Sequence, residues 1–313
     1  MQRAETLIRR IDGWVFAAED ARRLAALRIG LCVVLALRLA ITDYGTVARE
    51  PGLFQPDSYM HLFERMPSPE VAATLQVCGI VAALAAAAGL ALRLSLPLAV
   101  GCSLVLNGML DSAGRVIVGD AVLTLCLLIL LAAGAAASEA WSLRAPVRRA
   151  LGMSPSSVSR TATGARYGWP VRTAMVVIAL AYFFAGFQKW RYSGLPWVTS
   201  DNLRWILYAA SDNHSHPNEL ALFVADRPIL AHLFAAGSLL LETSFALVLF
   251  VPRLRWLFVP GAVSMHLGIL LTMGLDYTAL AATVVIVFVD WPVVVAWVRR
   301  STETVPAPSA APR

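Results

Sequence analysis

Lys189 is the residue with the clearest capacity for chemistry, because it is the single lysine among the 26 basic residues of the chain. Arginine stays protonated in any protein setting, whereas a partly desolvated lysine can lose its proton and act as a base. Lys189 lies where a long apolar segment runs into a tryptophan-rich loop. We therefore predict that any catalysis in this protein is centred on Lys189. A coding bias that removed the other lysines would explain the same composition.

Glu242 and His266 are ionisable residues inside two further apolar segments. Such groups are costly in lipid and usually face other helices, water or a ligand. Glu242 lies about 11 residues from Arg253, and His266 lies about 11 residues from Arg255, both at segment ends. We therefore expect Glu242 and His266 near mid-membrane, where their side chains can pair. At 1.5 Å per residue, Lys189 is expected roughly 15 Å further out. Structural hydrogen bonds between helices or proton-coupled transport are the alternatives.

A second polar group is expected in the outer half of the membrane. Asp120 can pair there with Arg38 or Arg115, and Asp120 or Gln188 can position Lys189. A buried Arg–Asp pair that only fixes helix register is the structural alternative. The predicted catalytic residues are Lys189, Asp120, Glu242 and His266, and the predicted cofactor-binding residues are Gln188, Trp190, Trp197, Arg115 and Arg38.

The composition determines which elements must position these side chains. Hydrophobic residues make up 58% of the chain, charged residues only 15%, and the mean hydropathy is +0.67, which excludes an ordinary soluble domain. We predict an all-α, polytopic integral membrane bundle of about eight transmembrane helices, each near the roughly 20 residues that cross a bilayer. The predicted spans are 24–42, 71–91, 94–111, 116–136, 171–189, 229–251, 256–274 and 277–298.

Arginine is distributed unevenly between the two sides of this predicted bundle. Seventeen arginines fall in the terminal segments and the connections on one side, and six fall in the connections on the other side together with nine acidic residues. Since positive residues stay on the cytoplasmic side, both termini are predicted to be cytoplasmic, in a bacterial-type inner (cell) membrane. This asymmetry explains the net charge of +6, so no nucleic-acid partner is expected.

Three regions follow from the same pattern. Residues 1–23 form an amphipathic segment expected to lie on the cytoplasmic membrane surface, 24–298 form the transmembrane domain, and 299–313 form a tail expected to be disordered. The four cysteines fall within predicted spans without metal-ligand spacing. We expect neither a disulfide nor a metal site.

The run Tyr182–Trp190, followed by Gly194 and Trp197, resembles the signature of the HTTM (horizontally transferred transmembrane) superfamily, which includes vitamin K-dependent gamma-glutamyl carboxylase. Three other segments agree with this resemblance, which covers about 24–298. They are Leu27–Gly30, the polar turn from Asn107 to Asp120, and Gly274–Tyr277 before the last span.

The resemblance implies a carboxylase-like lyase or a quinol epoxidase. In the carboxylase, a lysine at the Lys189 position is taken to deprotonate vitamin K hydroquinone. Oxygen then converts the quinol to an epoxide, and the strong base so generated removes a glutamate gamma-proton before CO2 adds. A reduced quinone is the implied cofactor, and a secreted peptide or a small molecule is the implied substrate.

Two departures from the carboxylase pattern bear on this expectation. The carboxylase has a histidine in this polar turn, and the closest position in this sequence is Arg115. Arginine cannot shuttle a proton. The 313 residues also hold no counterpart of the large lumenal portion that grips the carboxylase substrate. The alternative function is a non-catalytic membrane module that binds lipid or quinone, or assists maturation or export of a secreted peptide.

Overall fold

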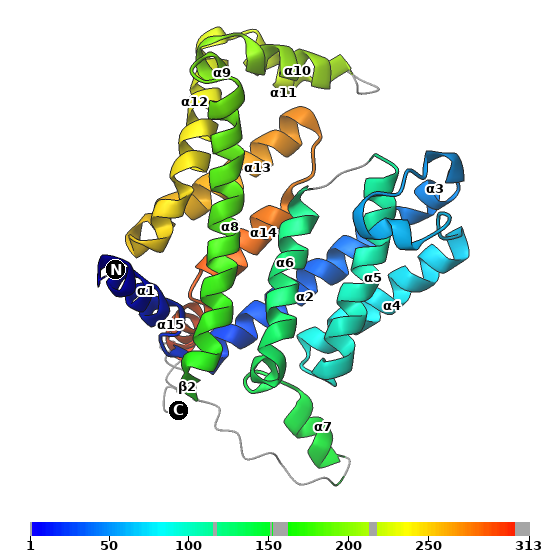
Figure 1. Cartoon of the computed structure of the whole chain (residues 1–313), viewed down its shortest axis with the longest axis vertical. Coiled ribbons are helices and arrows are strands. Elements are labelled where there is room, and N and C mark those ends of the chain that lie inside the picture. Colours follow the sequence, from blue (N-terminus) through cyan, green and yellow to red (C-terminus); the bar gives the residue numbers. More distant parts are fainter. Residues whose placement is uncertain (1, 115–117, 151, 153–161, 213–217, 304–313) are drawn as a thin grey trace, which may run out of the picture.

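The computed structural model describes residues 2–114, 118–150, 152, 162–212 and 218–303, and this part of the chain is almost entirely helical. The elements are α1 (Gln2–Val15), β1 (Glu19–Asp20), α2 (Ala21–Ile41), α3 (Tyr44–Ala48), η1 (Pro51–Leu53), η2 (Ser58–Leu62), α4 (Pro69–Ala87), α5 (Leu92–Ser112), α6 (Val118–Ala133), η3 (Gly134–Ser138), α7 (Arg144–Ala150), β2 (Thr163–Gly164), α8 (Ala165–Tyr192), α9 (Pro196–Thr199), α10 (Asn202–Asp212), α11 (Glu219–Ala225), α12 (Pro228–Ser244), η4 (Phe245–Leu249), η5 (Pro252–Leu254), α13 (Arg255–Met273), α14 (Thr278–Phe288) and α15 (Trp291–Glu303). Figure 1 shows one helical bundle with α9, α10 and α11 at one end and α1, α7, β2 and α15 at the other. The predicted all-α bundle is confirmed.

Seven helical segments in the described part of the chain are long and apolar enough to cross a membrane, and each overlaps a predicted span. They are Ala21–Ile41, Pro69–Ala87, Leu92–Ser112, Asp120–Ser138, Ala165–Tyr192, Pro228–Leu249 and Pro252–Met273. Local sequence sets several of their ends. The side chains of Asp20 and Ser68 accept hydrogen bonds from backbone N–H groups at the starts of α2 and α4. Gly274, with a φ of 67°, ends α13 in the left-handed conformation.

The last predicted span, 277–298, is broken. α14 and α15 meet at an angle of 77°. With 11 residues, α14 is about 16 Å long, roughly half the hydrocarbon thickness of a bilayer. Pro292 explains why one helix does not run through this segment, because it has no N–H to donate to the carbonyl of Phe288 and is tolerated in the first turn of a helix, where α15 places it. α15 then continues to Glu303, so the first residues of the predicted disordered tail are helical, and 304–313 lie outside the described residues.

α2 occupies the centre of the bundle, where it packs against α4, α6, α8 and α14. Small residues allow this close packing. They are common at helix contacts in membranes, because burying apolar side chains away from lipid contributes little and van der Waals contact between the helices contributes more. A Cβ atom on Gly79 of α4 would lie 2.8 Å from Leu39 Cδ1, and one on Gly30 of α2 would lie 2.7 Å from Ile286 Cγ2. The buried face of α4 consists of Ala72, Gly79, Ala82, Ala83, Ala86 and Ala87.

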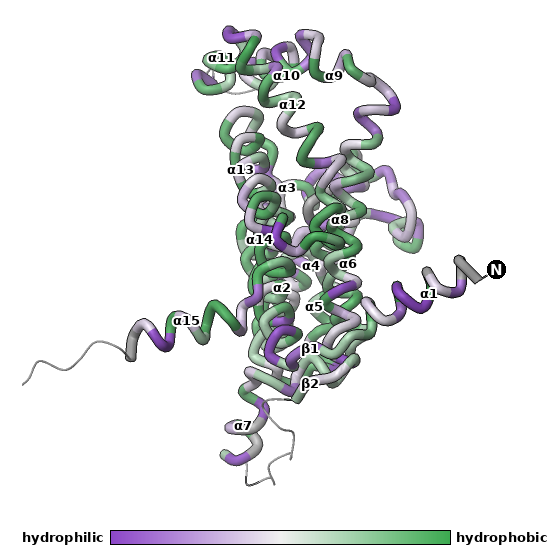
Figure 2. Tube along the Cα trace, turned by 90° about the vertical axis from the view of Figure 1, so that its left-hand side faces the viewer, coloured by the Kyte–Doolittle hydropathy of each residue, from purple (hydrophilic) through white to green (hydrophobic). Residues whose placement is uncertain are grey.

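We call the end of the bundle that carries α1, the β1–β2 pair, α7 and α15 the arginine-rich end. β1 pairs antiparallel with β2, with Glu19 opposite Gly164, and this ties the start of α2 to the start of α8. Figure 2 shows α1 and α15 projecting sideways from the bundle at this end, in opposite directions. Ile8 and Ile11 of α1 are exposed.

Candidate active site

Lys189 is held by a carboxylate from another helix. Near the end of α8, its Nζ donates hydrogen bonds to both oxygens of Glu242 in α12, with 2.5 Å to Oε1. The Glu242 side chain is 8% exposed and the Lys189 side chain 23% exposed. The lysine is therefore largely enclosed and paired.

The predicted separation of Lys189 and Glu242 is wrong. The prediction assumed that the span 171–189 ends, and the span 229–251 begins, at the same level of the outer membrane surface. Lys189 lies three residues before the end of α8, whereas Glu242 lies 14 residues, about 21 Å, beyond the start of α12. Contact between the two requires α12 to begin well beyond the end of α8. Figure 2 shows α12 reaching up to the level of α9 and α10.

Gly186 permits this contact. A Cβ atom at this position would lie 2.7 Å from the backbone nitrogen of Thr243 and 3.0 Å from Glu242 Cβ. The missing side chain lets α12 approach α8 closely one turn before Lys189. The Ala185-Gly186-x-x-Lys189 spacing thus has a physical reason, since the glycine brings the carboxylate within reach of the amine.

Replacing Gly186 with alanine is expected to push α12 away from α8 and to break the ion pair. The matched control is Gly237→Ala in α12, where a new Cβ atom would meet nothing within 4 Å. Since alanine is favoured over glycine in a helix by up to about 1 kcal/mol, the control is expected to keep or raise the melting temperature. Gly186→Ala is expected to lower it, measured in detergent. Equal melting temperatures for the two variants would contradict this account of Gly186.

A second buried pair lies beside the first. Tyr182 Oη and His266 Nε2 are 2.7 Å apart, and the Tyr182 ring stacks on Phe245 with centroids 4.3 Å apart. Glu242 interacts electrostatically with Tyr182, and Lys189 with His266. The expected Glu242–His266 pair is therefore replaced by two neighbouring pairs, because α8 supplies Lys189 to Glu242 of α12 and Tyr182 to His266 of α13.

Tyr182 was not among the predicted site residues, although the spacing contains its signal. Tyr182, Gly186 and Lys189 are separated by four and three residues, so they share one face of α8. All three meet α12 or α13. An i, i+4, i+7 reading of the motif would have added the tyrosine to the site.

Two nitrogen atoms around these pairs are buried without a hydrogen-bond partner among the described residues. They are His266 Nδ1 and Trp197 Nε1. Lys189 Nζ lies 5.2 Å from the centroid of the Trp197 ring. Buried polar atoms are almost always satisfied in folded proteins, so these two are candidates for contact with a ligand.

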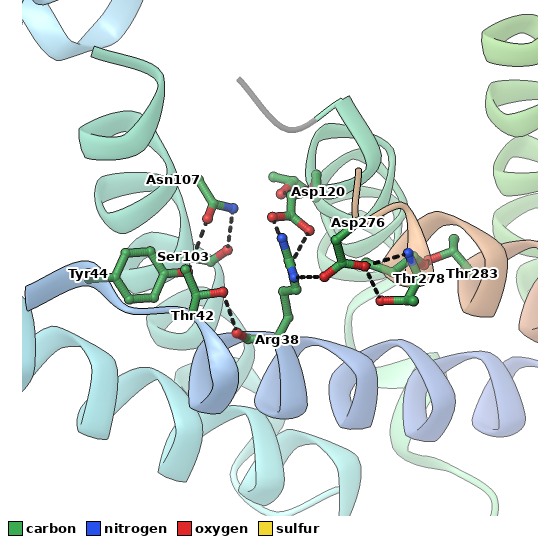
Figure 3. Close-up of polar contacts among 11 residues, drawn as sticks. Arg38, Thr42, Tyr44, Ser103, Asn107, Asp120, Asp276, Thr278 and Thr283 are labelled. Atoms are coloured by element: carbon green, nitrogen blue, oxygen red, sulfur yellow. Dashed lines mark hydrogen bonds and ion pairs between the residues drawn. The ribbon is translucent and has the colours of Figure 1, made fainter. Parts of the chain in front are cut away.

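Asp120 and Arg38 form a different site, shown in Figure 3. Arg38 Nε of α2 lies 2.9 Å from Asp120 Oδ1, and its Nη1 lies 2.5 Å from Asp276 Oδ2 in the loop between α13 and α14. The expected role of Asp120 in positioning Lys189 is therefore not observed, since both carboxylate oxygens of Asp120 accept from Arg38 Nε. The cluster joins α2, α6 and the α13–α14 loop. This supports the alternative in which the Arg38–Asp120 pair only fixes the register of the helices.

The loop between α13 and α14 links the two clusters through adjacent residues. Asp276 binds Arg38, while the ring of Tyr277 stacks on His266 with centroids 5.4 Å apart. Burial raises the pKa of Asp276, but its hydrogen bonds from Thr278 and the charge of Arg38 outweigh this and leave the pKa below its usual value. The left-handed turn at Gly274 directs both residues into the bundle.

The remaining predicted residues do not join the site. Gln188 and Trp190 are exposed near the end of α8, and Arg115 lies outside the described residues. The structure thus brings together Lys189, Glu242, Trp197, His266 and the unpredicted Tyr182. Comparison with protein-family models, curated proteins and solved structures finds no match for this chain.

Proposed function

We propose that this protein is an integral membrane enzyme of carboxylase-like type, in which Lys189 removes a proton from a lipid-soluble quinol. The observation that carries the proposal is the enclosed Lys189–Glu242 pair, which lies next to the Tyr182–His266 pair. Four groups able to exchange protons are thus gathered in an apolar bundle. General acid–base catalysis requires such groups at hydrogen-bond distance from the reacting proton.

The pairing with Glu242 gives Lys189 a route to a neutral amine. Moving one proton from the ammonium to the carboxylate leaves the pair without net charge in either form. In a poorly solvated environment the ammonium–carboxylate form loses more hydration energy than the amine–carboxylic acid form. The energy difference between the two forms is therefore smaller than it is in water. Glu242 therefore replaces Asp120 and Gln188 as the partner that prepares the base.

The surroundings of the pair suit a quinol ring with two oxygen atoms. Trp197 Nε1 can donate a hydrogen bond, and His266 Nδ1 can donate or accept one according to its tautomer, and both are buried without a partner in the described structure. A bound vitamin K-type quinol would supply, on reaction with oxygen, a base strong enough to remove a carbon-bound proton. A secreted peptide is the proposed substrate of that base.

Orientation in the membrane follows from the arginine distribution. α1 and α15 both leave the bundle at the arginine-rich end (Figure 2), and we assign this end to the cytoplasmic face of a bacterial-type inner membrane. Lys189 near the end of α8 then lies toward the outer face, on the side of a secreted substrate.

Replacing Lys189 with arginine tests the proposal. Arginine keeps the positive charge beside Glu242 but cannot lose its proton, so quinol turnover is expected to fall at least about 100-fold. The measurement is oxidation of a vitamin K-type naphthoquinol by the protein in lipid nanodiscs. Arg191→Lys, an exposed change on the same helix end, serves as the control and should leave turnover unchanged. Turnover that survives Lys189→Arg would refute the assignment of the base.

The second candidate is a non-catalytic module that binds lipid or quinone or assists a secreted peptide. The observation in its favour is the set of exposed aromatic residues near the end of α8 and on α10, namely Trp190, Tyr192 and Trp205. Aromatic residues of this kind are enriched at membrane interfaces. For this function, quinol or lipid binding should tolerate Lys189→Arg and be lost on replacing Trp190 and Trp205 with serine.

A further inference from the structure

A groove of about 490 Å³ opens at the arginine-rich end, between the start of α2 and the side of α15. Its lining includes Glu19, Arg22 and Arg23 on one side and Val293, Trp297 and Arg300 on the other. This groove is not part of the candidate active site.

α15 reaches the groove because the chain turns by 77° after α14. In Figure 2 the helix stands out sideways from the bundle, opposite α1. Val293 and Trp297 are four residues apart, so they share a face of the helix, and they are 62% and 68% exposed. A helix that leaves a bundle sideways and exposes tryptophan and valine has the features of a segment lying in the membrane interface.

The charges around the groove are unbalanced. Arg22 binds Asp20, while Arg23 and Arg172 share a single oxygen of Glu19, at 3.0 and 2.8 Å. Arg255 is close enough to interact electrostatically with Arg23, Arg172, Glu19 and Asp290. Among the groups whose contacts the structure gives, the four arginines Arg22, Arg23, Arg172 and Arg255 thus accompany three carboxylates, those of Glu19, Asp20 and Asp290, an excess of one positive charge.

Part of this positive charge lacks a hydrogen-bond acceptor in the described structure. Nε and Nη2 of Arg23 and Nε of Arg255 are buried without a partner. Arg22 lines the groove with 41% of its side chain exposed and is therefore accessible to an entering group. Guanidinium groups bind phosphate through paired N–H donors, so an oxyanion in the groove suits this cluster of arginines.

We infer that the groove binds the phosphate of an anionic phospholipid from the adjacent leaflet. Arg22 and Arg300 contact the phosphate, and Arg23 and Arg255 add attraction from behind. The glycerol and acyl chains lie along Val293 and Trp297. A lipid accounts for both the charge excess and the exposed apolar face of α15, whereas a soluble phosphate would leave that face uncovered.

The test measures binding of phosphatidylglycerol and phosphatidylcholine to the full-length protein in detergent by native mass spectrometry. The wild-type protein is expected to prefer phosphatidylglycerol. The double variant Arg22→Gln/Arg300→Gln is expected to lose most of this preference, about fivefold for each arginine. Arg22→Gln keeps the cap of α2, because Asp20 accepts from the backbone nitrogen of that residue. Arg49→Gln/Arg65→Gln, in the connection between α3 and α4 outside the arginine-rich end, is the control and should keep the preference.

Two further measurements test for a bound lipid without replacing any arginine, in case the arginine variants fold poorly. Trp297→Ser changes no charge and is expected to weaken binding of phosphatidylglycerol while leaving binding of inorganic phosphate unchanged. Addition of inorganic phosphate to the wild-type protein should displace phosphatidylglycerol only weakly. Equal binding of the two lipids, or full displacement by inorganic phosphate, would overturn the assignment of a lipid.

Discussion

Replacing Glu242 with leucine is expected to destabilise the folded protein by about 3 kcal/mol, because it leaves the Lys189 charge without its partner. Removal of one member of a buried ion pair costs roughly 3–5 kcal/mol. The residual 23% exposure of Lys189 places the expected value at the lower end of this range. The free energy of unfolding in detergent, followed by helix content during denaturant titration, measures the effect.

The double variant Lys189→Met/Glu242→Leu separates the stability of the pair from its chemistry. Apolar residues of similar size often replace a buried ion pair at little cost, so most of the lost stability is expected to return. Quinol turnover is nevertheless expected to be absent, because no base remains. A stable double variant with full turnover would show that the pair is structural, and a double variant as unstable as Glu242→Leu would show that the charge is not the cause.

Replacing Arg28 with methionine is expected to cost about 3–5 kcal/mol, because it leaves several buried carbonyl oxygens without a donor and each such loss costs roughly 1–3 kcal/mol. Arg28 is fully buried in α2, and its guanidinium donates to the carbonyl oxygens of Trp141 at 2.7 Å, Ala87 at 3.2 Å and Ala140 at 3.4 Å, as well as to that of Ala137. These carbonyls lie at or just after the ends of α4 and η3, where helices leave acceptors unpaired and carry partial negative charge.

The shape of the guanidinium group explains why this position needs arginine. Its fixed fork of N–H donors reaches acceptors on two segments at once, whereas a lysine ammonium is a point charge. Arg28→Lys is therefore expected to remain clearly destabilised in the same denaturant titration. Arg93→Met, an exposed arginine at the start of α5, is the control and should change stability by less than about 0.5 kcal/mol. Arg28→Lys with wild-type stability would contradict this account.

Several features of the site were predictable because they are local. The motif around Lys189 places Tyr182, Gly186 and Lys189 on one face of α8 by helical spacing alone. Asp120 was expected to pair with Arg38 or Arg115 because all three lie in the outer half of the membrane, and the structure pairs it with Arg38. The partner of Lys189 was not predictable in this way, since it depends on how far α12 extends beyond α8.

The break in the last predicted span was also not predictable from local sequence. Residues 277–298 have the composition of a complete span, and hydropathy takes no account of the direction of the helix axis. Asp290 and Pro292 supply a local reason for a turn, yet its angle of 77° results from the packing of α14 in the bundle, against α2, α6 and α13.

The amino-acid sequence alone determined that this protein is a helical membrane bundle, and it singled out one lysine as the residue able to act as a base. These properties follow from composition, from the length of apolar segments and from side-chain chemistry, which do not depend on the neighbours of a residue in space. The tertiary structure decided that Glu242 pairs with Lys189, that Tyr182 pairs with His266, and that Asp120 belongs to a separate cluster. Such pairings depend on the vertical offset between helices, which is set by close contacts such as that between Gly186 and α12.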